Sequence, residues 1–369
     1  MKKTLLVLAI AMVFIGCTST TEDAESIKIS SGYVYLNQGG TSTLDYYNIK
    51  ADSLYTEVYQ KNNPGETLSS YAEAIYQSEN YIFITLQGGY RTGDGGKVLV
   101  LNKNFKKIAE FDHHTGGYLT AYLEYDESKN ELFVSYYKGN YPNSDDMMLK
   151  KFNFSITNDI LSVEKVLEKT ILAQGFGNIK IRKFGDKLYV KGSNLTIVNT
   201  SDFSVETVSL NKPITDVIQY EGNIIASVLQ TKEGIVSESG YYVLTDGVVT
   251  DSLIGAYGYS KLIVSDNRLF GIKLGGSITD QVYATSAISE LDISLKVEST
   301  LVSHSGLSFV GSSYKSFTHD VSSENFIFPG KPVYGNPTIT PSYITTESGV
   351  VTKIFEHKNE TSFIIVLSE

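Results

Sequence analysis

The feature that most constrains the fold is a repeated unit in which a short polar turn leads into an apolar strand. Its copies recur along the chain at Ser78–Phe83, Ser128–Phe133, Gly185–Tyr189, Glu221–Ile225, Asp266–Phe270 and Ser323–Ile327. The intervals scatter around about 50 residues, which is the period of four-stranded propeller blades. The repeat therefore predicts a β-propeller.

Strands on either side of each turn complete the predicted blade. The apolar strands that precede the turns include Ala72–Tyr76, Leu119–Tyr122, Asn178–Ile181, Thr215–Tyr220 and Lys261–Val264. After the turn come a third strand, a tight turn and a fourth strand, with these later turns at Asn102–Asn104, Thr200–Asp202, Asp246–Gly247 and Ser348–Gly349. No segment shows a convincing helical period, so the fold class is all-β.

The two ends of the chain complement each other. Residues 33–59 supply only three strands, Tyr33–Leu36, Thr43–Asn48 and Leu54–Tyr59, while Ser362–Leu367 is a single strand. Pairing the last strand with the first blade would close the ring and leave no open edge. The count is then about seven four-stranded blades, with six or eight as alternatives.

The first residues predict a lipid anchor. Met1–Lys3 is basic, Leu5–Ile15 is an apolar run too short to span a bilayer, and Gly16 precedes Cys17, as in a bacterial lipobox. The predicted organisation is a signal peptide over 1–16, a lipidated flexible tether over 17–30, and a single propeller domain over 31–369. An ordinary signal peptide with an incidental cysteine is the alternative.

Cysteine content and charge narrow the function further. Cys17 is the only cysteine, so no disulfide forms within the chain. Without Lys2 and Lys3, 29 basic residues face 41 acidic ones and the mature charge is −12. This balance argues against nucleic acid as a partner. Acylation of Cys17 would anchor the protein in a membrane. The acidic residues of the tether, Glu22, Asp23 and Glu25, resemble the surface-export signal of Bacteroidota lipoproteins, which implies the outer membrane, with the cell surface ahead of the periplasmic face.

Several segments resemble a known family. Gly32–Gly40, Thr43–Tyr47, Ala72–Thr85 and Val98–Ala109 are similar to the opening blades of Bacteroidota surface lipoprotein propellers, a quinoprotein-like group. That group includes propellers that capture cobalamin above a TonB-dependent transporter. The resemblance implies a surface location, a transporter partner and a small-molecule or glycan ligand. No cofactor is predicted, and a metal or a tetrapyrrole-type ligand is left open.

This sequence also departs from that family. Gln38 replaces the usual acid, Gln87–Gly96 reads as an insertion, and Asn325–Phe328 lacks the usual Asp-Ala pair after its strand. The resemblance therefore supports the fold and the location and leaves the ligand undetermined.

One face of the predicted ring is elaborated. The connections between second and third strands are long in most blades, at Gln87–Gly96, Lys138–Asp146, Gln230–Ser239, Gly275–Ala284 and Gly330–Thr340. In a propeller these connections share a face with the connections between blades, and insertions on one face of a repeat protein mark its binding face. Val310–Glu324 is expected to be a longer connection on the opposite side.

The candidate ligand-binding residues lie in these connections. They are Tyr90, Arg91, Tyr141, Tyr283 and Tyr334, together with four histidines, His113, His114, His304 and His357. Tyr and Arg suit recognition, and histidines at one mouth suit a ligand or metal site. His319 is expected to lie elsewhere. The alternative explanation is that polar residues collect in loops by chance.

Three functions are compatible with this pattern. The favoured one is a module that captures a ligand or assists a transporter through the elaborated face. The alternatives are a lactonase-like hydrolase or lyase and an envelope scaffold that binds other proteins. No zinc-protease, nucleophile-elbow or phosphate-loop motif occurs, so an enzyme is less favoured.

Overall fold

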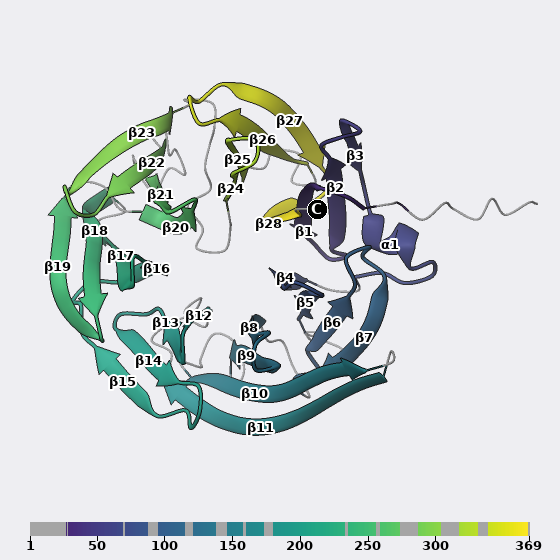
Figure 1. The fold of residues 1–369 in the computed structure, drawn as a ribbon, viewed down its shortest axis with the longest axis horizontal. Coiled ribbons are helices and arrows are strands. Elements are labelled where there is room, and N and C mark those ends of the chain that lie inside the picture. Colours follow the sequence, from purple (N-terminus) through teal and green to yellow (C-terminus); the bar gives the residue numbers. More distant parts are fainter. Residues whose placement is uncertain are drawn as a thin grey trace, which may run out of the picture.

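The computed structural model describes residues 27, 29–68, 71–87, 95–114, 121–137, 146–157, 160–172, 180–232, 235–255, 259–273, 287–303, 317–330 and 339–367. They form seven four-stranded antiparallel sheets around a central axis (Figure 1). The seven-bladed propeller predicted from the repeat is confirmed.

The innermost strand of each blade lies at the centre of the ring and the fourth strand at its rim. Blade 1 consists, from the inside outwards, of β28 (Glu360–Leu367), β1 (Gly32–Gln38), β2 (Thr43–Asn48) and β3 (Ser53–Tyr55). Blade 2 consists of β4 (Ala72–Gln77), β5 (Ile82–Leu86), β6 (Lys97–Leu101) and β7 (Lys107–Asp112). Blade 3 consists of β8 (Ala121–Asp126), β9 (Glu131–Tyr137), β10 (Asp146–Thr157) and β11 (Ile160–Leu172).

The remaining blades follow the same order. Blade 4 consists of β12 (Ile181–Phe184), β13 (Lys187–Val190), β14 (Leu195–Asn199) and β15 (Val205–Val208). Blade 5 consists of β16 (Ile214–Tyr220), β17 (Asn223–Lys232), β18 (Ile235–Thr245) and β19 (Val248–Gly255). Blade 6 consists of β20 (Tyr259–Ser265), β21 (Arg268–Lys273), β22 (Ala287–Asp292) and β23 (Val297–Ser303). Blade 7 consists of β24 (Thr318–Asp320), β25 (Asn325–Pro329), β26 (Thr340–Thr346) and β27 (Val351–His357).

Antiparallel strand order gives the ring two different ends. The tight turns between first and second strands, and between third and fourth strands, lie at one end, which we call the turn end. The connections between second and third strands and between blades lie at the other, the connection end. Polar residues suit the tight turns because these turns need a positive φ, which Glu221 (48°), Gly222 (78°), Asp266 (50°) and Asn267 (55°) adopt.

The last strand closes the ring as predicted. β28 pairs antiparallel with β1 from Gly32 opposite Leu367 to Gln38 opposite Glu360. Blade 1 is thereby built from both ends of the described chain, and its innermost strand gains a partner. Closure removes the unpaired edge that an open ring would expose.

Aromatic side chains fill the space between neighbouring blades. Phe83 of blade 2 lies 4.9 Å from Tyr125 and 5.2 Å from Phe154 of blade 3, measured between ring centroids. Phe83 and Phe154 are almost fully buried. Each large apolar side chain buried this way contributes about 1.5–3 kcal/mol to stability, so contacts between blades are a main source of the core.

The structure corrects three sequence expectations. The predicted strand Leu54–Tyr59 ends at Tyr55, because the backbone amide of Glu57 turns to Asp45 Oδ1 (3.0 Å) and a short helix, α1 (Val58–Asn62), follows. The expected loop Gln230–Ser239 is largely a continued hairpin, in which Gln230 pairs with Glu238 and Lys232 with Ile235.

The third correction concerns blade 7. A long connection over Val310–Glu324 was expected at the turn end. Instead β24 occupies Thr318–Asp320, and only the tight turn from Val321 to Glu324 lies between it and β25. Among the described residues, no helix has the length and apolarity needed to cross a membrane.

Candidate functional site

The innermost strands of blades 4, 5 and 6, namely β12, β16 and β20, lie at the centre of the ring (Figure 1), and charged side chains on or next to them interact with one another. Arg182 lies in β12, Asp216 in β16 and Lys261 in β20, the innermost strands of these blades. Lys180 directly precedes β12, and Lys191 directly follows β13. All five lie toward the connection end of their strands. We call these five residues the channel cluster.

Two strand irregularities place the central pair of this cluster. β16 shifts register between Ile214 and Asp216, and β20 shifts register between Tyr259 and Lys261. Such bulges redirect the side chains that follow them. As a result Asp216 Oδ2 lies 3.6 Å from Lys261 Nζ and accepts a hydrogen bond of 2.9 Å from the amide of Leu262.

The other cations of the cluster have weaker partners. Lys191 Nζ donates to the carbonyl oxygen of Thr215 (3.0 Å). The Nε atom of Arg182 is buried without a hydrogen-bond partner among the described groups. Lys180 Nζ lies 5.9 Å from the ring centroid of Phe363, and no carboxylate of the described residues forms an ion pair with it.

The electrostatics of the cluster follow from burial and from an excess of like charge. Burial, together with Lys261 and Arg182, lowers the pKa of Lys180 well below its usual value. Burial lowers the pKa of Lys191 to about 8. Burial alone would raise the pKa of Asp216, but the surrounding cations, Lys261 first among them, hold it well below its ordinary value. Asp216 is therefore ionised, and the cations around it remain in surplus.

Blades 1 and 3 contribute side chains next to these cations. Phe363 of β28 faces Lys180, and the Tyr122 ring of β8 lies 6.4 Å from the Phe363 ring. Both rings are buried. Glu124, also in β8, interacts with Arg182 and Lys180, yet burial raises its pKa to about 7. The cluster therefore has an aromatic neighbour and a weakly ionised acid beside it.

The predicted residues His113 and His114 lie at the connection end, after β7. Their Nδ1 atoms are 2.9 Å apart, and His114 stacks on Tyr136 of blade 3 with ring centroids 4.9 Å apart. Only 1% of His113 and 6% of His114 is exposed. A Cβ atom on Gly96 would stand 2.3 Å from His114 Cε1, so the backbone packs directly on the pair. These imidazoles are part of the packing between blades.

His357, the last residue of β27, joins the first and last blades. Its Nδ1 lies 2.7 Å from Asp45 Oδ2 in β2, and its Nε2 lies 2.7 Å from Ser342 Oγ in β26. We call Asp45, Ser342 and His357 the seam cluster. Its order matches a hydrolase triad, but Ser342, His357 and Asp45 are only 0%, 1% and 2% exposed. The serine is therefore sealed from any substrate in this conformation.

The remaining predicted site residues cannot be placed. Tyr90, Arg91, Tyr141, Tyr283, His304, Tyr334 and Cys17 all lie outside the described residues. His319, expected apart from the other histidines, lies in β24 near the turn end, where its Nε2 is 2.9 Å from Glu347 Oε1. No group of three potential metal ligands occurs among the residues that the structure describes.

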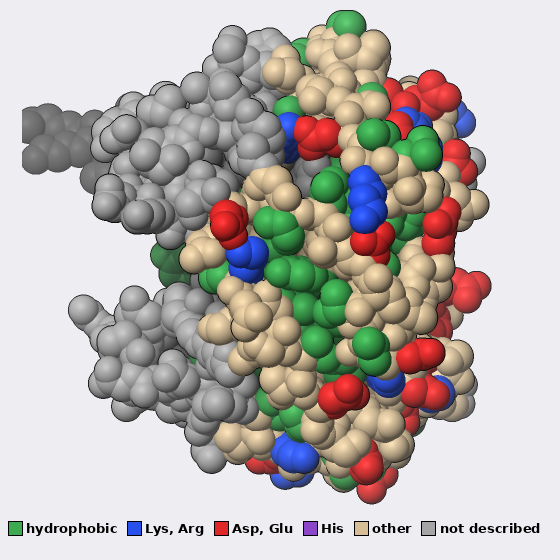
Figure 2. Space-filling model, turned by 90° about the vertical axis from the view of Figure 1, so that its left-hand side faces the viewer, with side chains coloured by type: hydrophobic (Ala, Val, Ile, Leu, Met, Phe, Trp, Pro, Cys, Tyr) green, Lys and Arg blue, Asp and Glu red, His purple; other side chains and the backbone are tan. Residues whose placement is uncertain are grey.

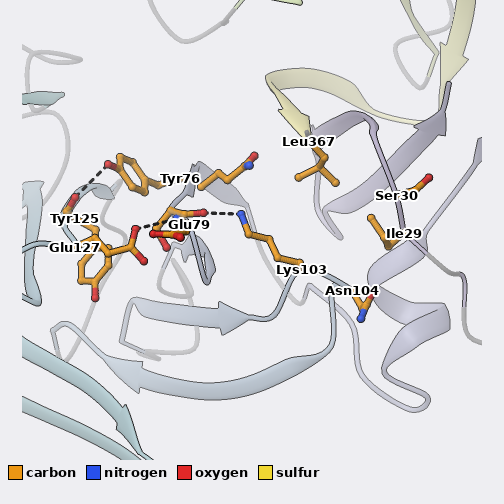
Figure 3. A pocket seen from close by; sticks show the side chains of 11 residues that line it. Ile29, Ser30, Tyr76, Glu79, Lys103, Asn104, Tyr125, Glu127 and Leu367 are labelled. Carbon is orange, nitrogen blue, oxygen red and sulfur yellow. Dashed lines mark hydrogen bonds between the residues drawn. The ribbon is translucent and has the colours of Figure 1, made fainter. Parts of the chain in front are cut away.

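A cavity of about 890 Å³ lies at the opposite, turn end of the ring (Figure 3). Its polar walls are largely satisfied by the protein. Glu127 accepts hydrogen bonds from the amide of Glu79 and from Asn80 Nδ2, both 2.8 Å long, and Lys103 Nζ donates to the carbonyl oxygen of Ser78. Ile29, from the first described residues, forms part of the wall. We therefore regard the channel cluster as the stronger site.

Sequence reasoning missed the channel cluster. It located the strands Thr215–Tyr220 and Lys261–Val264 but concentrated on the loops between strands. The predicted strand Asn178–Ile181 overlaps the observed β12 only at Ile181. The available signal was a charge near the start of each of three successive innermost strands. Lys180 and Arg182 alternate at the first of these strands, and Asp216 and Lys261 lie at the next two. A charge at the same place in successive repeats indicates one shared location.

Comparisons with known proteins support the fold. No family model and no curated protein matches the chain. A solved structure described as a quinonprotein alcohol dehydrogenase-like protein from Bacteroides thetaiotaomicron is similar over 91% of this chain and 78% of its own, with a TM-score of 0.65 and 13% identity. Kuenenia stuttgartiensis hydrazine synthase is similar over 81% of this chain and 95% of its own, with a TM-score of 0.54 and 11% identity. At these identities the similarity extends to the propeller fold alone.

Proposed function

We propose that this chain is a lipid-anchored envelope protein whose propeller captures a small ligand at the connection end of its channel. The observation that carries the proposal is the channel cluster. Four cations, Lys180, Arg182, Lys191 and Lys261, are gathered around the single ionised carboxylate of Asp216. Like charges held together without full compensation cost stability, and such sites are commonly functional.

The location of the cluster supports a binding role. It lies toward the connection end, where the sequence elaborates the connections between strands. Residues 88–94, 138–145, 274–286 and 331–338 depart from described strands at this end. Tyr90, Arg91, Tyr141, Tyr283 and Tyr334 belong to these segments. A charged cluster at the end where these connections begin would suit a ligand site.

The anchor would leave this end free. Ile29 and Ser30 lie at the cavity of the turn end, and β1 starts there at Gly32. Lipid on Cys17 would therefore attach through a tether that begins at the end opposite the channel cluster. We propose the outer membrane as the location, with the surface-exposed leaflet favoured and a TonB-dependent transporter as a candidate partner.

The anchoring half of the proposal has a direct test. Cys17→Ser, expressed in a Gram-negative host, should move the protein from the membrane fraction to the soluble fraction. The mature amino terminus of the unmodified protein should carry acyl mass. Unchanged membrane association together with a terminus free of lipid would contradict the anchor.

The binding half is tested by a ligand screen on the full chain in detergent. A ligand that binds only the folded protein raises its unfolding temperature. We expect a subset of small metabolites or glycans to do so, to be recovered unchanged by mass spectrometry, and to lose their effect in Lys261→Met. Consumption of the compound would support the enzyme alternative instead, and a screen without any shift would overturn the proposal.

A further inference from the structure

The charge of the channel cluster has the opposite sign to the rest of the protein. The whole chain carries a net charge of −10. In the side view of Figure 2, many acidic side chains lie toward the end of the ring that is opposite the grey residues. Turn-end residues such as Glu221, Asp246 and Asp266 are exposed. The cations at the centre are therefore a local exception.

Nearby acids do not neutralise these cations. Four cationic side chains face the carboxyl groups of Asp216 and Glu124. Burial raises the pKa of Glu124 to about 7, so at neutral pH this group is only partly ionised. The basic side chains of the cluster therefore outnumber its carboxyl groups.

One buried hydrogen-bond donor of the cluster is also without a partner among the described residues. An ammonium group has three donors and a guanidinium group five. Among the described groups, Lys191 Nζ donates to Thr215, Lys261 Nζ lies beside Asp216, and Lys180 faces an aromatic ring. Arg182 Nε is buried and has no acceptor within the part of the chain that the structure describes. Buried donors without acceptors are rare in folded proteins, and they are most simply explained by an acceptor supplied from outside.

The side chains around these donors restrict the chemistry further. A guanidinium group favours the paired oxygens of carboxylates and phosphates, and buried ammonium groups add further charge-assisted bonds. Phe363 and Tyr122 provide apolar surface beside Lys180. A ligand that matches both the basic groups and this apolar surface would carry acidic oxygens on a flat or apolar body.

We infer that the channel cluster binds a small organic dianion, through carboxylate or phosphate oxygens held by Arg182 and the lysines, with its apolar part against Phe363. This inference rests on the proposed binding function and specifies its ligand class. Carboxylates and phosphates share the recognised chemistry, so the experiment must separate them.

The experiment measures binding to the full chain in detergent by titration calorimetry and thermal unfolding. The probes are phthalate, phenyl phosphate, succinate and inorganic phosphate, with benzamide as the neutral aromatic control. We expect phthalate or phenyl phosphate to bind more tightly than succinate or inorganic phosphate, and benzamide not to bind. Whichever of phthalate and phenyl phosphate binds more tightly identifies the acidic group.

Variants connect any binding to the cluster. Lys180→Met and Arg182→Leu should each weaken binding by about ten-fold or more, because each removes a charge-assisted contact. Lys187→Met, in the same blade but at the turn end, is the matched control and should bind as the unmodified protein does. Phe363→Leu should reduce the preference for phthalate over succinate.

The outcomes separate this inference from the proposed function. A neutral compound that binds and loses its effect in Lys180→Met, without any response to dianions, would overturn the anion class and retain the binding module. Dianion binding of equal strength in Lys180→Met, Arg182→Leu and Lys187→Met would overturn the assignment to the cluster. A lack of response to every probe here and in the wider screen would overturn both.

Discussion

The seam cluster and the channel cluster are both polar groups enclosed by blades, yet they are built in opposite ways. At the seam, His357 is bonded on both sides, by Asp45 and Ser342, and Asp45 also accepts from Asn37 Nδ2 (2.8 Å). In the channel, basic side chains outnumber acidic ones, and Arg182 Nε has no acceptor among the described residues. A network in which the polar groups are hydrogen-bonded to one another holds elements together. A network with unpaired donors is, in our proposal, a ligand-binding site. Enclosure by the fold alone does not distinguish them.

The histidines show why this distinction matters. Sequence position placed His113, His114 and His357 at the connection end, and the structure agrees that they follow outer strands there. Their packing, however, is with the neighbouring blades, and each is nearly buried. Among the described residues, Arg182 on the innermost strand β12 has a buried nitrogen without a hydrogen-bond partner, and so does His113. The ligand role predicted for the loop residues outside the described part stays a prediction.

The largest expected effect comes from opening the seam completely. Deleting Glu360–Leu367 removes β28, so blade 1 loses its innermost strand and β1 exposes an unpaired edge. We expect cooperative unfolding to be lost, or the protein to aggregate, as followed by circular dichroism and light scattering. A chain that ends at Leu367 keeps all of β28 and is the control. An unchanged melting transition in the deletion variant would mean that the seam does not hold the ring closed.

Removing one member of the seam cluster should have the next largest effect. His357→Ala leaves both the buried Asp45 carboxylate and the Ser342 hydroxyl without their imidazole partner. Breaking a buried pair from one side costs about 3–5 kcal/mol, measured as the free energy of unfolding in urea. Lys358→Ala, at the exposed neighbouring position, should stay within about 0.5 kcal/mol of the unmodified protein. If His357→Ala lowered the free energy of unfolding only slightly, the seam cluster would not hold the fold together, and the contrast with the channel cluster would fail.

The channel cluster should respond to pH in the opposite sense to a stabilising ion pair. Burial lowers the pKa of Lys191 to about 8 in the folded protein, against an ordinary value near 10.5, in surroundings that include Asp216, Lys261 and Arg182. Its charged form therefore destabilises the fold below pH 8, and this penalty declines as the pH rises from about 8 to 10.5.

The expected result is a comparison between two proteins over pH. Lys191→Met should be more stable than the unmodified protein at pH 7, and the difference should shrink between pH 8 and 10.5. The measurement is the unfolding midpoint in urea at each pH. A constant difference over this range would show that the charge of Lys191 has no energetic effect on the fold.

The sequence was sufficient for the architecture because apolar alternation and turn chemistry act locally. The turns at Glu221–Gly222 and Asp266–Asn267 require residues that tolerate positive φ, and their spacing counts blades directly. Closure by Ser362–Leu367 followed from the missing strand in residues 33–59. The channel cluster was not predictable in the same way, because contact between Asp216 and Lys261 depends on how two bulged strands from different blades face each other. Sequence spacing carries little of that information.

The central claim is that the seam cluster holds the fold while the channel cluster binds a ligand. Its most direct test is the unfolding temperature of Lys180→Met without ligand. This substitution removes an amino group whose charged form is disfavoured by burial and by Lys261 and Arg182, and it keeps a similar apolar stem. We predict an unfolding temperature equal to that of the unmodified protein or roughly 2 °C higher, which corresponds to a gain on the order of 1 kcal/mol in the free energy of unfolding. Dianion binding should be lost at the same time. A fall in unfolding temperature comparable to that of His357→Ala would contradict the account, because the channel cations would then be structural.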